Sequence, residues 1–292
     1  MNNAPRVAVV THARMENLFL QIWTAHYGRH FGTENLHLLK DGDDWSSPAE
    51  AKFGTVSTVH FHGTRQERDQ QIAAVLSEYC NGLLGEYDFV LRSDCDEIIV
   101  PDPATGDWDT VFEECRAGGY LYTLGLDVIQ HLEEEAPIDI QRPILSQRFY
   151  ASVAGGYCKP NLICAPVSWT SACHEIEGKP VRLSRSLLLF HLASMDRDHL
   201  EQRLKERGDL ANKSYNGHAK RRLNQFDILL EFKAHALDEA RGELVAKITL
   251  DDEGAPKQSP RFSKIFGRRW AAIKLPERFA ALIGPLPQEH AM

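Results

Sequence analysis

The sequence predicts an α/β protein built on a Rossmann-like sheet that is mixed but mostly parallel, with flanking helices. Short apolar runs, typical of buried strands, alternate with helical patterns through the first third of the chain. A cluster of acids follows the fourth of these runs directly, at the edge where such sheets bind ligands. From residue 195 onward the pattern is helical and charged. We therefore expect a sheet domain over residues 1–194 and a mostly helical C-terminal extension over residues 195–292.

The first strand, helix and second strand follow one another closely. Residues 7–10 form a continuous apolar run, as expected for a strand buried on both faces. Apolar residues between positions 18 and 27 then recur at helical spacing, and glycines follow them. Residues 36–39 predict the second strand, which opens into the polar loop 40–44.

A third strand, a second helix and a fourth strand come next. Residues 56–62 alternate between polar and apolar, the pattern of a half-buried strand. Thr64 and Glu67 have the spacing of a capping box and predict the start of a helix. Its apolar face runs through residues 72–79, and residues 87–91 predict the fourth strand.

Later elements are predicted from shorter signals. Asp107 is a helix N-cap residue, and two glycines at positions 118 and 119 end the helix over residues 108–116. Strand-like runs follow at residues 120–129, 147–152, 162–167 and 187–191.

Composition excludes several classes of protein. A net charge of -8 argues against a nucleic-acid binder, because binding to a phosphate backbone needs a basic face. The N-terminus lacks a signal-peptide pattern and no run reaches the ~18 apolar residues of a membrane span, so we expect a cytoplasmic protein. Six cysteines without a CxxC pair are expected to be reduced thiols. A zinc site from Cys158, Cys164, Cys173 and His174 is disfavoured, because this spacing matches no common zinc motif.

Asp94, Asp96 and Glu97 stand at the end of the fourth strand, three carboxylates within four residues. Two such charges about 4 Å apart repel by up to ~4 kcal/mol at an effective dielectric near 20, so a positive group must compensate. Mn²⁺ or Mg²⁺ does so and keeps positions open for phosphate oxygens. An isolated Asp-x-Asp is more often a solvated turn, but the apolar strands on both sides favour a metal site here.

In the order of these features the chain resembles bacterial family 2 glycosyltransferases of the GT-A fold, in the branch marked by a DxDE segment. The features that carry the resemblance are Trp23-Thr24-Ala25-His26, Gly32, the acidic loop 40–44, Gln70 or Gln71, Tyr87-Asp88, Asp94-Cys95-Asp96-Glu97, Lys159, His174 and His191. They cover about residues 6 to 205. The chain departs from the group at Met15-Glu16-Asn17, where the group has an Asn-Glu pair, and at Leu192, where it has an aromatic residue.

The resemblance implies a GT-A-like fold and a metal-dependent, inverting glycosyltransferase of bacterial surface glycan synthesis. The donor would be a nucleotide-diphosphate sugar such as a UDP- or GDP-sugar, and the acceptor a hydroxyl of a carbohydrate or glycolipid. Asp94 and Asp96 would contact the metal or the ribose, with Asp96 the stronger metal ligand. His191, at the end of an apolar run, would be a further ligand of Mn²⁺ or Mg²⁺.

The remaining roles concern the nucleotide and the proton of the acceptor. Asp41 and Asp43 are expected to hold the base or ribose. Two cations, Arg92 and Lys159, would offset the charge of the leaving diphosphate. Transfer to a hydroxyl also needs a proton acceptor, for which His174 and Glu175 are the candidates and Asp127 the reserve.

Two other functions remain open at this stage. Similar sheets with paired carboxylates serve metal-dependent nucleotidyltransferases, although Thr11-His12-Ala13-Arg14 is not a glycine-rich phosphate loop. A non-catalytic carbohydrate-binding protein on the same fold is the third alternative. Residues 257–278 interleave seven cations with apolar side chains and are a candidate for peripheral contact with the inner face of a membrane.

Overall fold

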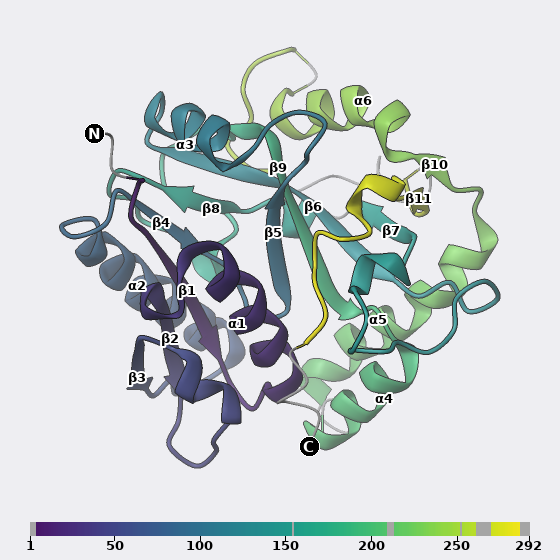
Figure 1. Cartoon of the computed structure of the whole chain (residues 1–292), viewed down its shortest axis with the longest axis horizontal. Helices are drawn as coiled ribbons and strands as arrows, with labels where there is room; N and C mark the ends of the chain where they lie inside the picture. The colour runs from purple at the N-terminus through teal and green to yellow at the C-terminus, as the bar shows by residue number, and fades with distance from the viewer. Residues whose placement is uncertain (1–3, 154, 209–212, 252, 261–269, 287–292) are drawn as a thin grey trace.

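The computed structural model describes residues 4–153, 155–208, 213–251, 253–260 and 270–286 (Figure 1). Its helices are α1 (Asn17–Phe31), α2 (Arg65–Leu83), α3 (Trp108–Arg116), α4 (Arg197–Glu206), α5 (Lys213–Glu231) and α6 (Leu237–Thr249). Its strands are β1 (Val7–Ala13), β2 (Leu36–Asp41), β3 (Thr55–Val59), β4 (Phe89–Arg92), β5 (Glu97–Pro101), β6 (Tyr120–Ile129), β7 (Tyr150–Val153), β8 (Pro160–Ile163), β9 (Leu183–Ser194), β10 (His235–Ala236) and β11 (Ile273–Lys274).

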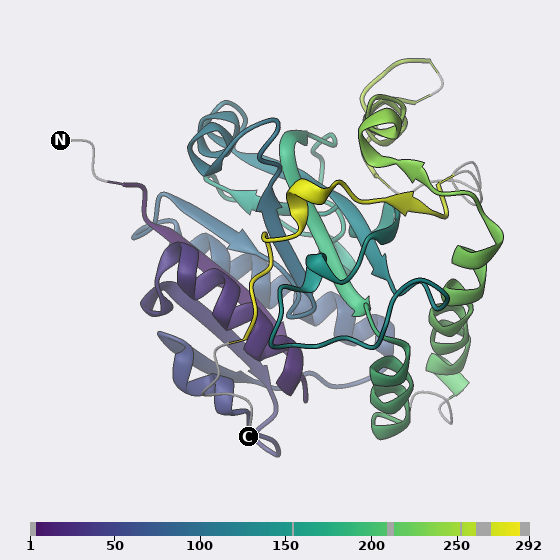
Figure 2. The same ribbon diagram turned by 45° about the vertical axis from the view of Figure 1, so that its right-hand side comes forward.

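The strands lie in one mixed sheet in the order β10-β11-β7-β6-β8-β4-β1-β2-β3, with β9 paired to β5 and β6. Neighbouring strands from β3 to β4 are parallel, as expected. The chain steps from β1 to β2 through α1, and in the opposite direction from β3 to β4 through α2. Because such crossovers are right-handed, the two helices cover opposite faces of these strands (Figure 2).

Beyond β4 the sheet is mixed, because the parallel pairs β6–β9 and β10–β11 stand among antiparallel ones. Strand β8 is antiparallel to both β4 and β6, and β5 is antiparallel to β9. The reason for β5 is local: only residues 93–96 separate it from β4, and a parallel neighbour needs a crossover of about a dozen residues or more. The acidic segment is therefore a tight turn between two strands.

Local signals in the sequence predicted several elements correctly. Thr64 and Glu67 form the capping box of α2, and the Asp107 side chain accepts the hydrogen bond from the Thr110 N–H that caps α3. The predicted range of β6 matches that of the structure. The strand expected at residues 187–191 is longer, because β9 begins at Leu183 and pairs along β6 as well as β5.

Residues after position 194 contribute to the same hydrophobic core as the sheet. Leu237, Ile273 and Phe279 are fully buried in the cluster that contains β1 and β4. The rings of Phe279 and Phe190 meet edge to face, 5.6 Å apart. The boundary near residue 194 stays a prediction, but the chain on its two sides shares one core.

The segment 257–278 lies partly outside the described residues. Its apolar residues Phe262, Ile265 and Phe266 belong to that part, as do Arg261, Lys264, Arg268 and Arg269. Within the described part, Trp270 and Leu275 are buried. In the ranges that the structure covers, no helix is long and apolar enough to cross a membrane.

Candidate functional site

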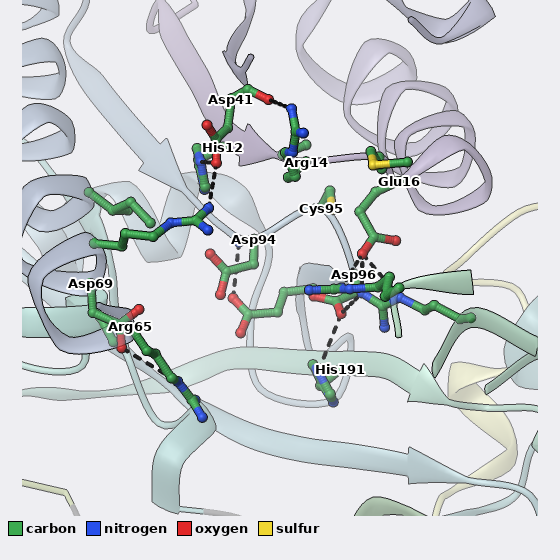
Figure 3. Close-up of a pocket in the computed structure, with 18 of the residues that line it drawn as sticks. His12, Arg14, Glu16, Asp41, Arg65, Asp69, Asp94, Cys95, Asp96 and His191 are labelled. Atoms are coloured by element: carbon green, nitrogen blue, oxygen red, sulfur yellow. Dashed lines mark hydrogen bonds and ion pairs between the residues drawn. The ribbon is translucent and has the colours of Figure 1, made fainter. Parts of the chain in front are cut away.

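A cavity of about 560 Å³ opens at the carboxyl ends of β1, β2 and β4, beside the acidic turn (Figure 3). Helices α4 and α5 close its opposite side. Arginines and carboxylates line it in equal number: Arg14, Glu16, Asp41, Arg65, Arg68, Asp69, Arg92, Asp94, Asp96, Glu97, Arg203, Glu206, Arg207 and Arg222. The lining of this cavity is thus close to electrically neutral.

Aromatic residues of α1 hold the acidic turn from behind. The Trp23 Nε1–H donates to Ser93 Oγ (2.9 Å), and the Ile99 N–H donates to the Tyr27 hydroxyl (2.8 Å). These two bonds fix the chain on each side of Asp94 and Asp96. His26 is buried beside Tyr27 and does not line the cavity. Trp23 and Tyr27 therefore support the turn.

Asp94 and Glu97 share a buried lysine. Lys159 Nζ lies 2.6 Å from Asp94 Oδ2 and 2.6 Å from Glu97 Oε1. Arg92 also donates to Asp94. Burial would raise the pKa of the Asp94 carboxyl, but Arg92 and Lys159 lower it well below its ordinary value. Burial and the charge of Asp94 raise the pKa of Glu97.

Asp96 faces His191, and Asp127 holds that histidine from the other side. His191 Nε2 is 3.6 Å from Asp96 Oδ2, while His191 Nδ1 is 2.7 Å from Asp127 Oδ1. Tyr157 stacks on the imidazole, with ring centroids 3.9 Å apart. Burial alone would lower the pKa of His191, but Asp127 and Asp96 raise it. Asp127, only 1% exposed, positions His191 and is too deeply buried to reach a substrate.

Arginines of α4 and α5 reach into the cavity, and sequence reasoning missed them. The Arg203 guanidinium bridges Glu16 and Asp96, and Arg207 Nη1 lies 2.7 Å from Glu16 Oε1. Arg222 Nη2 is 3.4 Å from His191 Nε2. The i, i+4 spacing of Arg203 and Arg207 was the available signal, because it puts both side chains on one helix face.

Of the two acids predicted to hold the base or ribose, one lines the cavity. Asp41 lines the cavity, and its Oδ2 accepts a hydrogen bond from Arg68 Nη2 (2.8 Å). His12 lies beside it, and burial lowers the pKa of this histidine to about 4. Asp43 is exposed and lines an adjoining depression with Asp41.

The predicted proton acceptors do not line the cavity. His174 and Glu175 are half-buried beyond its wall, and Glu175 Oε1 accepts from Ser259 Oγ (2.6 Å). Ala172 is the residue of this segment that reaches the cavity, with a positive φ of 59°. The role of His174 and Glu175 stays a prediction.

The residues present fit a hard divalent cation shared with phosphate. Among the side chains that the structure describes, no three acids, histidines or cysteines are grouped to hold a metal alone. Mg²⁺ and its relatives, however, are commonly bound by one or two protein ligands plus substrate phosphates, at about 2.1 Å. The separation of 3.6 Å between Asp96 Oδ2 and His191 Nε2 is within reach of one such ion. Metal-binding histidines are commonly oriented by a carboxylate on the other ring nitrogen, and the Asp127–His191 bond has this geometry.

Comparison with known proteins adds little to this description. No protein-family profile matches the chain. No curated protein sequence matches it either. Among solved structures, a cytidylyltransferase from Leptospira borgpetersenii serovar Hardjo-bovis is similar at 17% identity, over 41% of this chain and 54% of that chain, with a TM-score of 0.24. A mannose-1-phosphate geranyltransferase from Thermus thermophilus is similar at 13% identity, over 97% of this chain and 75% of that chain, with a TM-score of 0.25. The chain thus spans about half the length of the cytidylyltransferase, and neither similarity extends to function.

Proposed function

We propose that this protein is a metal-dependent glycosyltransferase that uses a nucleotide-diphosphate sugar. The observation that carries the proposal is the geometry of Asp96 and His191, which face each other in a cavity lined by arginines and carboxylates. Asp96 and His191 would hold the cation, with Asp94 beside them. The bound ion would supply Lewis-acid stabilisation of the departing diphosphate.

The charge of the cavity supports a diphosphate ester bound with a divalent cation. The two negative charges of such an ester and the two positive charges of the ion cancel. A nearly neutral lining can therefore accept the pair without a large excess of either sign. Lys159 and Arg92 hold Asp94 ionised. Arginines that line the cavity would bind the phosphate oxygens.

The proposal includes membership of glycosyltransferase family 2, the GT-A fold and inversion at the sugar. These parts rest on the resemblance of the motifs to that family. So do the carbohydrate or glycolipid acceptor and the role of His174 and Glu175 in accepting its proton. Asp41 would hold the nucleotide from the β2 side of the cavity, with Asp43 at the adjoining depression.

A binding screen with a matched variant tests the proposal. Thermal unfolding is followed with UDP, GDP and CMP, each with and without Mn²⁺. At a ligand concentration of 100 Kd we expect one diphosphate to stabilise the protein by about 2.7 kcal/mol, and only with metal. Asp96→Asn should remove this effect, while Asp109→Asn, an exposed acid of α3 outside the cavity, should keep it.

The same screen separates the alternatives. Stabilisation by nucleoside triphosphates, with pyrophosphate release in the presence of a sugar phosphate, would replace the proposal with a nucleotidyltransferase. Binding of sugars without any nucleotide effect would indicate a carbohydrate-binding protein. Hydrolysis or transfer from a panel of UDP- and GDP-sugars then identifies the donor.

A further inference from the structure

Each of the two proposed metal ligands is already contacted by an arginine. Arg203 Nη2 lies 3.2 Å from Asp96 Oδ2, and Arg222 Nη2 lies 3.4 Å from His191 Nε2. The two arginines come from different helices, α4 and α5, and meet at the 3.6 Å gap between the Asp96 and His191 atoms. A divalent ion at that gap would be repelled by both guanidinium groups.

Arg203 contacts Glu16 more closely than it contacts Asp96. Its Nη2 is 2.5 Å from Glu16 Oε1 but 3.2 Å from Asp96 Oδ2, and its Nε is also 3.0 Å from Glu16 Oε1. The guanidinium further lies over the ring of Phe19, 4.8 Å from its centroid. Arg203 can therefore release Asp96 while Glu16 keeps it at the cavity.

Arg222 has unused capacity to bind an anion. In the part of the chain that the structure describes, its buried Nε–H has no hydrogen-bond partner. Arg92, on the opposite wall, likewise has a buried Nε and Nη1 without partners in the described ranges. Buried donors of this kind favour a ligand that supplies several acceptor oxygens.

We propose that Arg203 and Arg222 exchange partners during donor binding, leaving Asp96 and His191 to the cation and turning to the diphosphate oxygens. This inference deepens the proposed function and rests on it. It makes Arg203 and Arg222 diphosphate-binding residues and Glu16 the positioning residue of Arg203. The exchange also couples the two ligands, because the diphosphate draws away the groups that compete with the metal.

Arg203→Gln distinguishes this exchange from a structural role, because it should move two affinities in opposite directions. Mn²⁺ binding without any other ligand, followed by the electron paramagnetic resonance of free Mn²⁺, should become about tenfold tighter, within the usual range of coupling between sites. Binding of inorganic pyrophosphate at saturating Mn²⁺, measured by calorimetry, should become about tenfold weaker through the lost charged contact. A residue that merely held α4 in place would weaken both affinities or neither.

Arg207→Gln is the matched control for charge. Arg207 contacts the same Glu16 oxygen and lines the same cavity, but the arginine of α4 that donates to Asp96 is Arg203. Its loss should change Mn²⁺ affinity by less than about twofold, as for a screened neighbouring charge. If Arg203→Gln does not fold by circular dichroism, Arg203→Met, which also removes the charge and keeps a long side chain, carries the test, and both shifts should have the same signs.

The outcomes separate this inference from the proposed function. Unchanged or weaker Mn²⁺ binding in Arg203→Gln, or unchanged pyrophosphate binding, overturns the exchange while the wild-type protein still binds both ligands. Equal gains in Mn²⁺ affinity in Arg203→Gln and Arg207→Gln also overturn it, because charge alone would then explain them. If the wild-type protein binds no metal-dependent diphosphate, the proposed function fails and the exchange fails with it.

Discussion

Replacing Lys159 by methionine should destabilise the fold through the two carboxylates that it leaves behind. Lys159 is 3% exposed and lies 2.6 Å from both Asp94 and Glu97, and Glu97 is fully buried. Without Lys159, Asp94 still has Arg92, whereas the hydrogen bond left to Glu97 among the described residues is that from the backbone N–H of Asp94, at 3.1 Å. Breaking a buried ion pair on one side costs about 3–5 kcal/mol, and we expect a loss in this range at neutral pH.

The pH dependence of that loss follows from Glu97. Its pKa is already raised by burial and by Asp94, and removing Lys159 should raise it further. A carboxyl group with a raised pKa in the folded state destabilises the protein where it is ionised and stops doing so as the pH falls through that pKa. The loss of folding stability caused by Lys159→Met should therefore be largest near pH 8 and smaller near pH 5.

Urea unfolding at both pH values measures the free energies of unfolding. The double variant Lys159→Met with Glu97→Gln should recover most of the loss, because no buried charge then remains at Glu97. Lys247→Met, which removes a surface pair with Glu243, is the control and should cost about 0.5 kcal/mol. A Lys159→Met deficit below about 1 kcal/mol, a deficit equal at both pH values, or no recovery in the double variant would refute the reasoning.

Two further predictions concern other parts of the molecule. Asp102→Asn removes the carboxylate shared by Arg241 and Arg278 and should cost about 2 kcal/mol at neutral pH. Burial raises the pKa of Asp102, but Arg278 and Arg241 bring it below its ordinary value, so this stabilisation is present above about pH 4 and is lost as the pH falls through the folded pKa. Urea titrations should show the gap between wild type and variant closing in acid; a constant gap would contradict this. Residues 257–278 are a candidate for contact with an anionic membrane, and the burial of Trp270, Ile273 and Leu275 takes these three out of the surface available for it. The protein should float with anionic liposomes at low salt and not at high salt; finding it all in the bottom fraction at low salt would exclude membrane binding.

Local patterns predicted the elements better than their pairing. The capping box at Thr64 and Glu67 and the cap at Asp107 are short-range signals, and both helices begin where these signals place them. Nothing in the sequence near β8 indicates that it lies between β4 and β6, because that position depends on contacts with strands far away in the chain. The parallel pairing of β1 to β4 was therefore predictable, and the mixed pairing of the later strands was not.

In the candidate site, too, some residues could be predicted from local sequence and others could not. Asp94 and Asp96 follow a buried strand, and His191 lies in an apolar run, so each could be found locally. Arg203 and Arg222 belong to charged helices whose patterns match those of ordinary solvated helices. Only the packing of α4 and α5 against the acidic turn distinguishes these two arginines from those of solvated helices. The sequence marks Glu16 only as a departure from the glycosyltransferase pattern that the chain resembles, and nothing in it pairs Glu16 with Arg203.

The arginine contact to Asp96 also affects how the chain folds as it is synthesised. Asp96 and Arg203 are 107 residues apart. At a synthesis rate of about 5–20 residues per second, the acids leave the ribosome about 5–20 s before their counter-charges exist. During this interval Glu16 and Asp96 lack their arginine partners and depend on His191, water, protons or metal ions. A nascent chain that ends near residue 194 therefore lacks the arginine partners of Glu16 and Asp96, and the change in composition there is a poor place to cut the protein for expression.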